Sequence, residues 1–155
     1  MNVDPAFQRL YEEEAGAVFR TVYLVCRDPS VAEEATQEAF ARALERWPRL
    51  RDRPWVGGWV TTTALNVARR TMRRGRPSQP ADATGHDIDE SLDLWRAVRQ
   101  LSLRQQQAVV LRYRLDFTVE DAAAAMGCDA GTVRTHLARA REALRARMGG
   151  IDVRT

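Results

Sequence analysis

The sequence has no lysine, only two cysteines and only two histidines among its 155 residues. Cys26 and Cys128 lie far apart and have no partners at the spacing of metal ligands, which argues against a structural zinc site or a disulfide framework. No segment approaches the run of about 20 apolar residues needed to cross a bilayer. The N-terminus lacks the basic and apolar segments of an export signal. We therefore expect a cytoplasmic protein without metal, cofactor or membrane insertion.

Signatures of catalysis are also missing. The sequence has no glycine-rich phosphate loop, no cluster of histidine with carboxylates, and no nucleophile with a base nearby in the chain. The two cysteines are interpreted as small core residues, and His136 as a residue of a helix surface or a DNA contact. We expect no catalytic residue, no enzymatic activity and no small-molecule substrate.

The charged residues are unevenly distributed. All 24 basic residues are arginines, against 21 acidic residues. Residues 11–40 carry seven acids and two arginines, whereas residues 42–76 carry ten arginines and two acids. Residues 81–93 carry five acids and no base, whereas residues 130–147 carry five arginines and one acid. Because guanidinium groups bind phosphate through a planar fork of donors, two separate basic segments favour a nucleic-acid partner. Biased codon usage is the alternative explanation for the preference for arginine.

Helical periodicity dominates and no alternating strand pattern appears, so the sequence predicts an all-α fold. In the first half we expect helices at residues 5–26, 29–47 and 59–74, with a loop over 48–58. Asp28 is a predicted cap of the second helix, with Pro29 at the first helical position. Ser30 with Glu33 offers an alternative start.

A stretch rich in proline, glycine, serine and aspartate, residues 75–91, is predicted to be a flexible linker. We expect two small helical domains, at residues 1–75 and 92–155, joined by the linker at 76–91. The second domain is predicted to contain helices at residues 92–101, 103–114, 118–126 and 130–148. Ser102 with Gln105 is the predicted start of the second of these helices, and Thr118 with Asp121 that of the third. Gly127 is predicted to end the third helix, and Asp129 to cap the fourth.

Residues 118–147 have the spacing of a helix-turn-helix, with a short helix, the tight turn Gly-Cys-Asp and a longer helix. On a helical wheel, one side of the longer helix carries Val133, Leu137, Ala140, Leu144 and Met148. The opposite side carries Arg134, Thr135, Ala138, Arg139, Glu142 and Arg145. Arginine can bond bidentately to guanine, and threonine and alanine can pack on a thymine methyl, so we predict that this helix enters the major groove. An ordinary amphipathic helix with a solvated arginine face is the alternative.

Three tryptophans surround a loop rich in arginine. The loop contains Arg49, Arg51 and Arg53, and the helix that follows ends with Arg69, Arg70, Arg73 and Arg74. Aromatic rings beside guanidinium groups are suited to binding unstacked single-stranded bases. We expect Trp47 and Trp59 in the core and Trp55 to be exposed.

Three stretches resemble the extracytoplasmic-function sigma factors of bacterial RNA polymerase, the smallest sigma-70 relatives. AEEATQEAFARAL at 32–44 is similar to the signature A-E-D-x-x-Q-E-x-F-x-x-A of region 2, and WVTTTALNVARRTMRR at 59–74 to W-L-x-x-x-A-x-N-x-A-x-D-x-x-R-R. The C-terminal stretch, with GTVRTHLARAR, resembles region 4. The resemblance implies a sigma factor that binds core RNA polymerase and directs promoter-specific initiation. It implies that the polymerase clamp contacts Glu34, Gln37 and Glu38.

The resemblance also implies how promoter DNA is bound. The melted −10 element would be recognised by Trp55, Arg51, Arg53, Asn66, Arg69, Arg70 and Arg73. The −35 duplex would be recognised by Arg134, Thr135, Ala138, Arg139, His136 and Arg141. An anti-sigma factor is expected as a further partner. A conventional dimeric helix-turn-helix regulator that binds a palindrome without polymerase is the alternative function.

Five positions depart from the family pattern and bear on the promoter sequence. Arg70 and Glu34 stand where the family has Asp, Asp116 where Gly is common, Ala122 where Ile is usual, and His136 where Arg is frequent.

Overall fold

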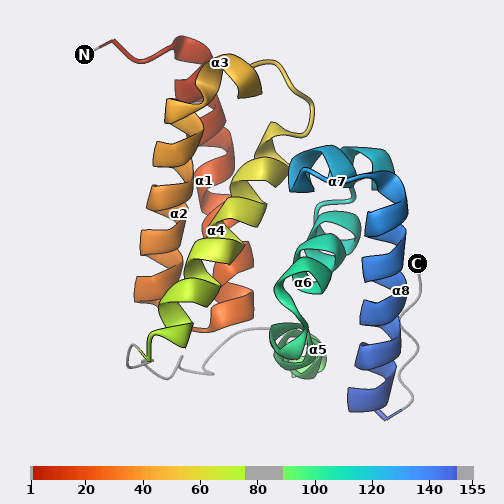
Figure 1. Cartoon of the computed structure of the whole chain (residues 1–155). Helices are drawn as coiled ribbons and strands as arrows, with labels where there is room; N and C mark the ends of the chain where they lie inside the picture. Colours follow the sequence, from red (N-terminus) through yellow and green to blue (C-terminus); the bar gives the residue numbers. More distant parts are fainter. Residues whose placement is uncertain (1, 76–88, 150–155) are drawn as a thin grey trace. The chain divides into compact units, whose positions relative to one another are not determined.

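The computed structural model describes residues 2–75 and 89–149, and all regular secondary structure in these two ranges is helical (Figure 1). The chain divides into two compact units, Met1–Pro80 and Ala81–Thr155, referred to below as the first and second unit. The all-α prediction is confirmed. Residues 76–88 of the predicted linker lie outside the described residues. The prediction that residues 89–91 belong to the linker is wrong, because they form the first turn of a helix.

The first unit is a bundle in which three long helices pack against one another (Figure 1). Its elements are α1 (Pro5–Cys26), α2 (Pro29–Glu45), the short α3 (Trp47–Leu50) and α4 (Val56–Arg73). The Asp28 side chain caps α2 by accepting hydrogen bonds from the backbone N–H groups of Ser30 and Val31. The predicted Asp28 cap is therefore confirmed, and the alternative start at Ser30 is wrong.

The predicted second helix, 29–47, breaks at Arg46. Pro48 has no N–H to donate to the carbonyl four residues earlier, so a continuous helix would lose a hydrogen bond there. The chain instead begins α3, with Pro48 in its first turn, where no such bond is needed.

The predicted loop 48–58 is also too long, because α4 begins at Val56. Gly57 lies inside α4, and a Cβ added to it would come 3.0 Å from Glu14 Oε1 of α1. This glycine therefore leaves room for the Glu14 side chain against α4.

Alanines and β-branched residues form much of the core between the three long helices. Its buried side chains include Phe7, Val18, Val22, Val31, Ala35, Ala39, Phe40, Trp47, Val60, Ala64 and Leu65. Trp47 is in the core as predicted, and its ring meets Phe7 edge-on with the ring centroids 5.3 Å apart. Trp59 is only half-buried. Leu44 of α2 is 42% exposed, although an apolar side chain at a helical spacing from Phe40 would be expected in the core.

The second unit contains the remaining helices. They are α5 (Asp89–Gln100), α6 (Leu103–Val109), the π-helical turn η1 (Val110–Arg114), α7 (Val119–Met126) and α8 (Ala130–Arg147). Ser102, Thr118 and Asp129 cap α6, α7 and α8 through their side chains, as predicted. The prediction of one regular helix over 103–114 is wrong, because its last turn widens to a π-helix in which Leu115 donates to the Val110 carbonyl.

Candidate nucleic-acid interface

Helices α7 and α8 form the predicted helix-turn-helix in the second unit (Figure 1). Gly127 ends α7 with φ 70°, in the left-handed region that glycine adopts without a steric cost. The turn is closed by Cys128, whose N–H donates to the Ala123 carbonyl at 3.0 Å. Val133 and Leu144 lie on the buried side of α8, as the helical wheel predicts. One side of α8 is thereby fixed against the unit, and the other is left to solvent.

The outward face of α8 carries the residues expected to recognise duplex DNA. Its exposed side chains are Arg134, Thr135, Ala138, Arg139, Glu142 and Arg145. The Arg134 guanidinium lies 3.4 Å from the Glu120 carboxylate of α7. The Thr135 hydroxyl donates to the Gly131 carbonyl within the helix at 3.1 Å. Both contacts orient side chains at the N-terminal end of this face, where a recognition helix meets base edges.

His136 and Arg141 lie closer to the body of the unit and are half-buried. Burial and the neighbouring charges of Arg104 and Arg139 lower the pKa of His136 below its ordinary value. The Arg141 guanidinium donates to the Tyr113 hydroxyl of the π-helical turn at 3.0 Å. Arg141 is therefore held by a hydrogen bond within the unit, and both side chains lie on the flank of the α8 face.

In the first unit, the residues expected to bind the melted strand extend along α4. Arg53 and Trp55 precede the helix, Asn66 is exposed near its middle, and Arg70 and Arg73 are exposed at its C-terminal end. A helix of 18 residues is about 27 Å long, so these side chains form a track rather than a single cluster. Trp55 is half-buried, so the expectation of an exposed ring is met only in part.

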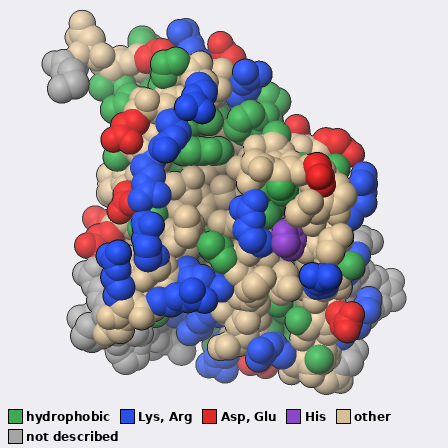
Figure 2. All heavy atoms as spheres, in the orientation of Figure 1, with side chains coloured by type: hydrophobic (Ala, Val, Ile, Leu, Met, Phe, Trp, Pro, Cys, Tyr) green, Lys and Arg blue, Asp and Glu red, His purple; other side chains and the backbone are tan. Residues whose placement is uncertain are grey.

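Arginines dominate the face of the first unit that contains this track. Figure 2 shows arginine side chains in a row along the face that α2 and α4 present in this view. Arg69 is half-buried, and burial together with the charge of Arg73 lowers its pKa. Such a row is suited to a phosphate backbone.

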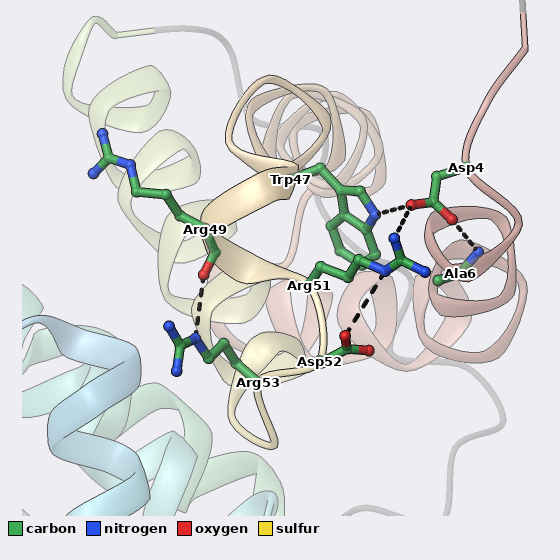
Figure 3. Close-up of polar contacts among 7 residues, drawn as sticks. All are labelled: Asp4, Ala6, Trp47, Arg49, Arg51, Asp52 and Arg53. Atoms are coloured by element: carbon green, nitrogen blue, oxygen red, sulfur yellow. Dashed lines mark hydrogen bonds and ion pairs between the residues drawn. The ribbon is translucent and has the colours of Figure 1, made fainter.

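The loop before α4 is held to the N-terminus by one carboxylate (Figure 3). Asp4 Oδ1 accepts the Ala6 N–H at 2.8 Å and so caps α1. Asp4 Oδ2 accepts the indole N–H of Trp47 at 2.9 Å and lies 3.4 Å from Arg51 Nη1. The hydrogen bond from Ala6, followed in size of effect by that from Trp47, lowers the pKa of Asp4, and the positive charge of Arg51 lowers it further.

The residues expected to contact polymerase lie on α2. Glu34 and Gln37 are exposed, and Gln37 donates to the Tyr11 hydroxyl at 3.0 Å. Glu38 forms ion pairs with Arg42 and, at 3.5 Å, with Arg70 of α4. Leu44 lies seven residues after Gln37, hence on the same side of the helix, and is exposed. No clear signal in the sequence indicates this exposed position, because Leu44 is also four residues after the buried Phe40.

Residues 2–75 and 89–149 contain neither a metal site nor a membrane-spanning helix. No three histidine, cysteine, aspartate or glutamate side chains come together as a metal site would require. None of the described helices combines the length and the apolar character needed to cross a membrane.

Comparison with known proteins decides the family. The family model for sigma-70 region 2 matches residues 10–77, and that for sigma-70 region 4 matches residues 91–144. The chain is 32% identical over 131 residues to the ECF RNA polymerase sigma factor SigC of Mycobacterium tuberculosis, which covers 77% of this chain and 71% of that protein. The chain belongs to the ECF sigma factors of RNA polymerase.

Further relatives agree with this assignment. The sigma factor is 28% identical over 157 residues to the RNA polymerase sigma-E factor of Streptomyces coelicolor, covering 95% and 88% of the two chains. It shares its fold with the sigma factor RpoE in the co-crystal structure with the anti-sigma factor NepR from Bartonella quintana. That match has a TM-score of 0.66 at 24% identity and covers 92% and 96% of the two chains. This ECF sigma factor directs promoter-specific transcription by core RNA polymerase, and the conventional dimeric regulator is not favoured.

Proposed function

We propose that the two units of this sigma factor bind one promoter through different interactions. The second unit recognises the −35 element as intact duplex, and the first unit binds core polymerase and the unpaired strand of the −10 element. The observation that supports this best is the arrangement of α8, whose apolar side is buried while Arg134, Thr135, Ala138 and Arg139 are exposed together.

Recognition of the −35 element proceeds from the exposed face of α8. Arg134 and Arg139 bond to base edges or phosphates, and Thr135 and Ala138 pack against thymine methyl groups. His136 and Arg141 contact the backbone at the flank of this face. Because contacts to phosphate release counterions, binding weakens as salt increases, with a logarithmic slope of about −0.9 for each phosphate contacted.

Binding of the −10 element follows the track along α4. Opening DNA costs on the order of 1.4 kcal/mol per base-pair step in lost stacking. Capture of an unpaired base by an aromatic ring returns about 1–3 kcal/mol. Trp55 supplies such a ring, and the strand is held by Arg53, Asn66, Arg69, Arg70 and Arg73. Arg51 lies in the same loop as Arg53 and Trp55. One or two captured bases do not offset the whole cost, so the isolated protein opens DNA poorly and polymerase contributes the remainder.

Polymerase binds the outward side of α2. Glu34, Gln37 and Glu38 offer two carboxylates and an amide to a basic partner surface, and Leu44 adds an exposed apolar side chain at the end of the same side. Tyr11 fixes Gln37 through its hydroxyl. This assignment is consistent with the excess of acids over residues 11–40.

An anti-sigma factor is a second protein partner in this proposal. The support is the relative RpoE, which was crystallised with the anti-sigma factor NepR. The protein acts in the cytoplasm, where polymerase transcribes the chromosome, and has no enzymatic activity of its own.

Reconstitution with purified core polymerase tests the proposal. Transcripts that begin when the protein is overproduced give the promoter, and initiation from that promoter should then depend on the protein. The variant Gln37→Ala should weaken polymerase binding and leave −35 duplex binding unchanged. The variant Arg139→Ala should weaken −35 duplex binding and leave polymerase binding unchanged. Dimeric binding to a palindrome without polymerase would contradict the proposal.

A further inference from the structure

The Asp4 carboxylate joins three segments that are distant in the sequence. It caps the first turn of α1, it accepts the indole N–H of Trp47 in the first turn of α3, and it is paired with Arg51 at the start of the loop (Figure 3). Trp47 is only 7% exposed, so its N–H has little access to water and depends on this acceptor.

The arginines of α3 and of the loop that follows it, residues 51–55, point to two different sides of this loop. Arg51 is turned toward Asp4, and its guanidinium also lies 3.8 Å from the Asp52 carboxylate. Arg53 donates through Nε to the Arg49 carbonyl at 3.3 Å. The guanidinium groups of Arg49 and Arg53 lie on the opposite side of the loop from that of Arg51 (Figure 3). One side therefore anchors the loop, and the other presents two cations.

The loop backbone depends on the same anchor. The Arg51 N–H donates to the Trp47 carbonyl at 2.8 Å, and the Arg53 N–H donates to the Leu50 carbonyl at 3.2 Å. Asp52, between them, has φ 64°, a conformation that aspartate and asparagine adopt more readily than most residues. A shift of Trp47 or Arg51 would therefore move Arg53 and Trp55, which precede α4.

We infer that Asp4 is a positioning residue for the strand-binding loop, residues 51–55, and that Arg51 serves this anchor, so that Arg49 of α3 and Arg53 of the loop are the arginines that contact DNA here. This inference rests on the proposed function of the loop, and it adds Asp4 and Arg49 to the residues on which −10 binding depends. A direct contact of Arg51 with DNA makes the opposite prediction, because loss of the Asp4 charge would then release Arg51 for phosphate.

The variant Asp4→Asn separates these possibilities. Asparagine is an equally good helix cap, so its amide oxygen can still accept the Ala6 N–H. Its amide group then faces the Trp47 N–H with a second donor and carries no charge for Arg51. The matched control is Asp52→Asn, which removes the same charge beside Arg51 but leaves the Trp47 contact and tolerates the same backbone conformation.

The first measurement is amide hydrogen exchange of the free full-length chain. In D4N, the N–H groups of Arg51 and Arg53 should exchange about fivefold faster, as expected for the loss of a hydrogen-bonded anchor. In D52N their exchange should be unchanged. Equal exchange in D4N and the wild type would overturn the anchor.

The second measurement is binding of holoenzyme to a fork-junction DNA whose single strand carries the −10 segment mapped from the transcript starts. D4N should weaken binding about fivefold, D52N should not weaken it, and Arg51→Gln should add less than twofold to D4N because both act on one anchor. Tighter DNA binding by D4N would overturn the inference. So would an equal loss of DNA affinity when R51Q is introduced into the wild type and into D4N. If wild-type holoenzyme does not bind the fork, the proposed function fails, and hydrogen exchange still decides whether Asp4 anchors the loop.

Discussion

The Arg70 guanidinium of α4 lies 3.5 Å from the Glu38 carboxylate of α2. Glu38 is one of the residues proposed to bind polymerase, and Arg70 is one of those proposed to bind the −10 strand. The same carboxylate is paired with Arg42. The two proposed surfaces of the first unit therefore meet at this carboxylate, and a change at either residue alters the charge offered to both partners.

Replacement of Arg70 by glutamine should strengthen polymerase binding and weaken −10 binding. Both side chains are 43% exposed, and exposed ion pairs contribute about 0.2–1 kcal/mol, so the gain in polymerase affinity should not exceed about fivefold. This gain in affinity should become smaller as the salt concentration increases, because salt screens exposed ion pairs. Titration of core polymerase with R70Q measures this, with R74Q as the control for loss of one charge from the same region. Equal affinities for R70Q and R74Q would show that the ion pair does not affect polymerase binding.

On α8, Arg139→Ala should cost about 1–3 kcal/mol of −35 binding and relax specificity at one base pair, as expected for loss of a bidentate base contact. Arg145→Ala removes the same side chain from later in the exposed face and should weaken binding to all sequences alike. Competition binding against every single-base variant of the −35 element distinguishes the two. A uniform loss from R139A would contradict a base contact and indicate a phosphate contact.

Acid should destabilise the second unit through His136. Its pKa in the folded chain is lowered, first by burial and then by the charges of Arg104 and Arg139. His136 in the unfolded chain therefore binds a proton more tightly than in the folded chain. The stability that neutral His136 allows is fully present above about pH 6.5, and it is lost as the pH falls through the folded pKa. Urea unfolding between about pH 7.5 and 5.5 should show a smaller loss of stability in H136N than in the wild type. Identical pH dependence in both proteins would contradict this.

Gly127→Ala should destabilise the helix-turn-helix by about 1–2 kcal/mol, because φ at this position is 70° and a side chain is strained there. No heavy atom from elsewhere in the fold lies within 4 Å of the added Cβ, so the cost comes from the local backbone conformation and not from a clash with packed neighbours. Gly131→Ala is the matched control. Its Cβ would make an ordinary contact at 3.5 Å inside a regular helix, and the change should stabilise α8 by up to about 1 kcal/mol. Thermal unfolding of both variants tests the pair, and equal shifts would contradict a left-handed requirement at Gly127.

Features that depend on neighbouring residues were predictable from the sequence. The caps at Asp28, Ser102, Thr118 and Asp129 each join a side chain to a backbone N–H two or three residues later, so a short motif defines them. The exposed and buried faces of α8 follow from helical periodicity alone.

Features that depend on contacts between distant segments were not predictable in this way. Asp4 and Trp47 are 43 positions apart, and Tyr113 and Arg141 are 28 apart. The contact between Gly57 of α4 and the Glu14 side chain of α1 joins positions 43 apart, and Leu44 is exposed although its residue type suggested the core. Composition and spacing contain no information about these pairs, because each forms only when the helices pack.

The reactivity of thymines in the −10 element toward permanganate, which modifies unpaired thymine, tests the central claim most directly. The mapped promoter should become reactive only when core polymerase and this protein are both present. The protein alone should protect the −35 duplex weakly and leave the −10 thymines unreactive. Protection of a duplex palindrome by the protein alone, with no polymerase-dependent reactivity at the −10 position, would contradict the division of roles between the two units.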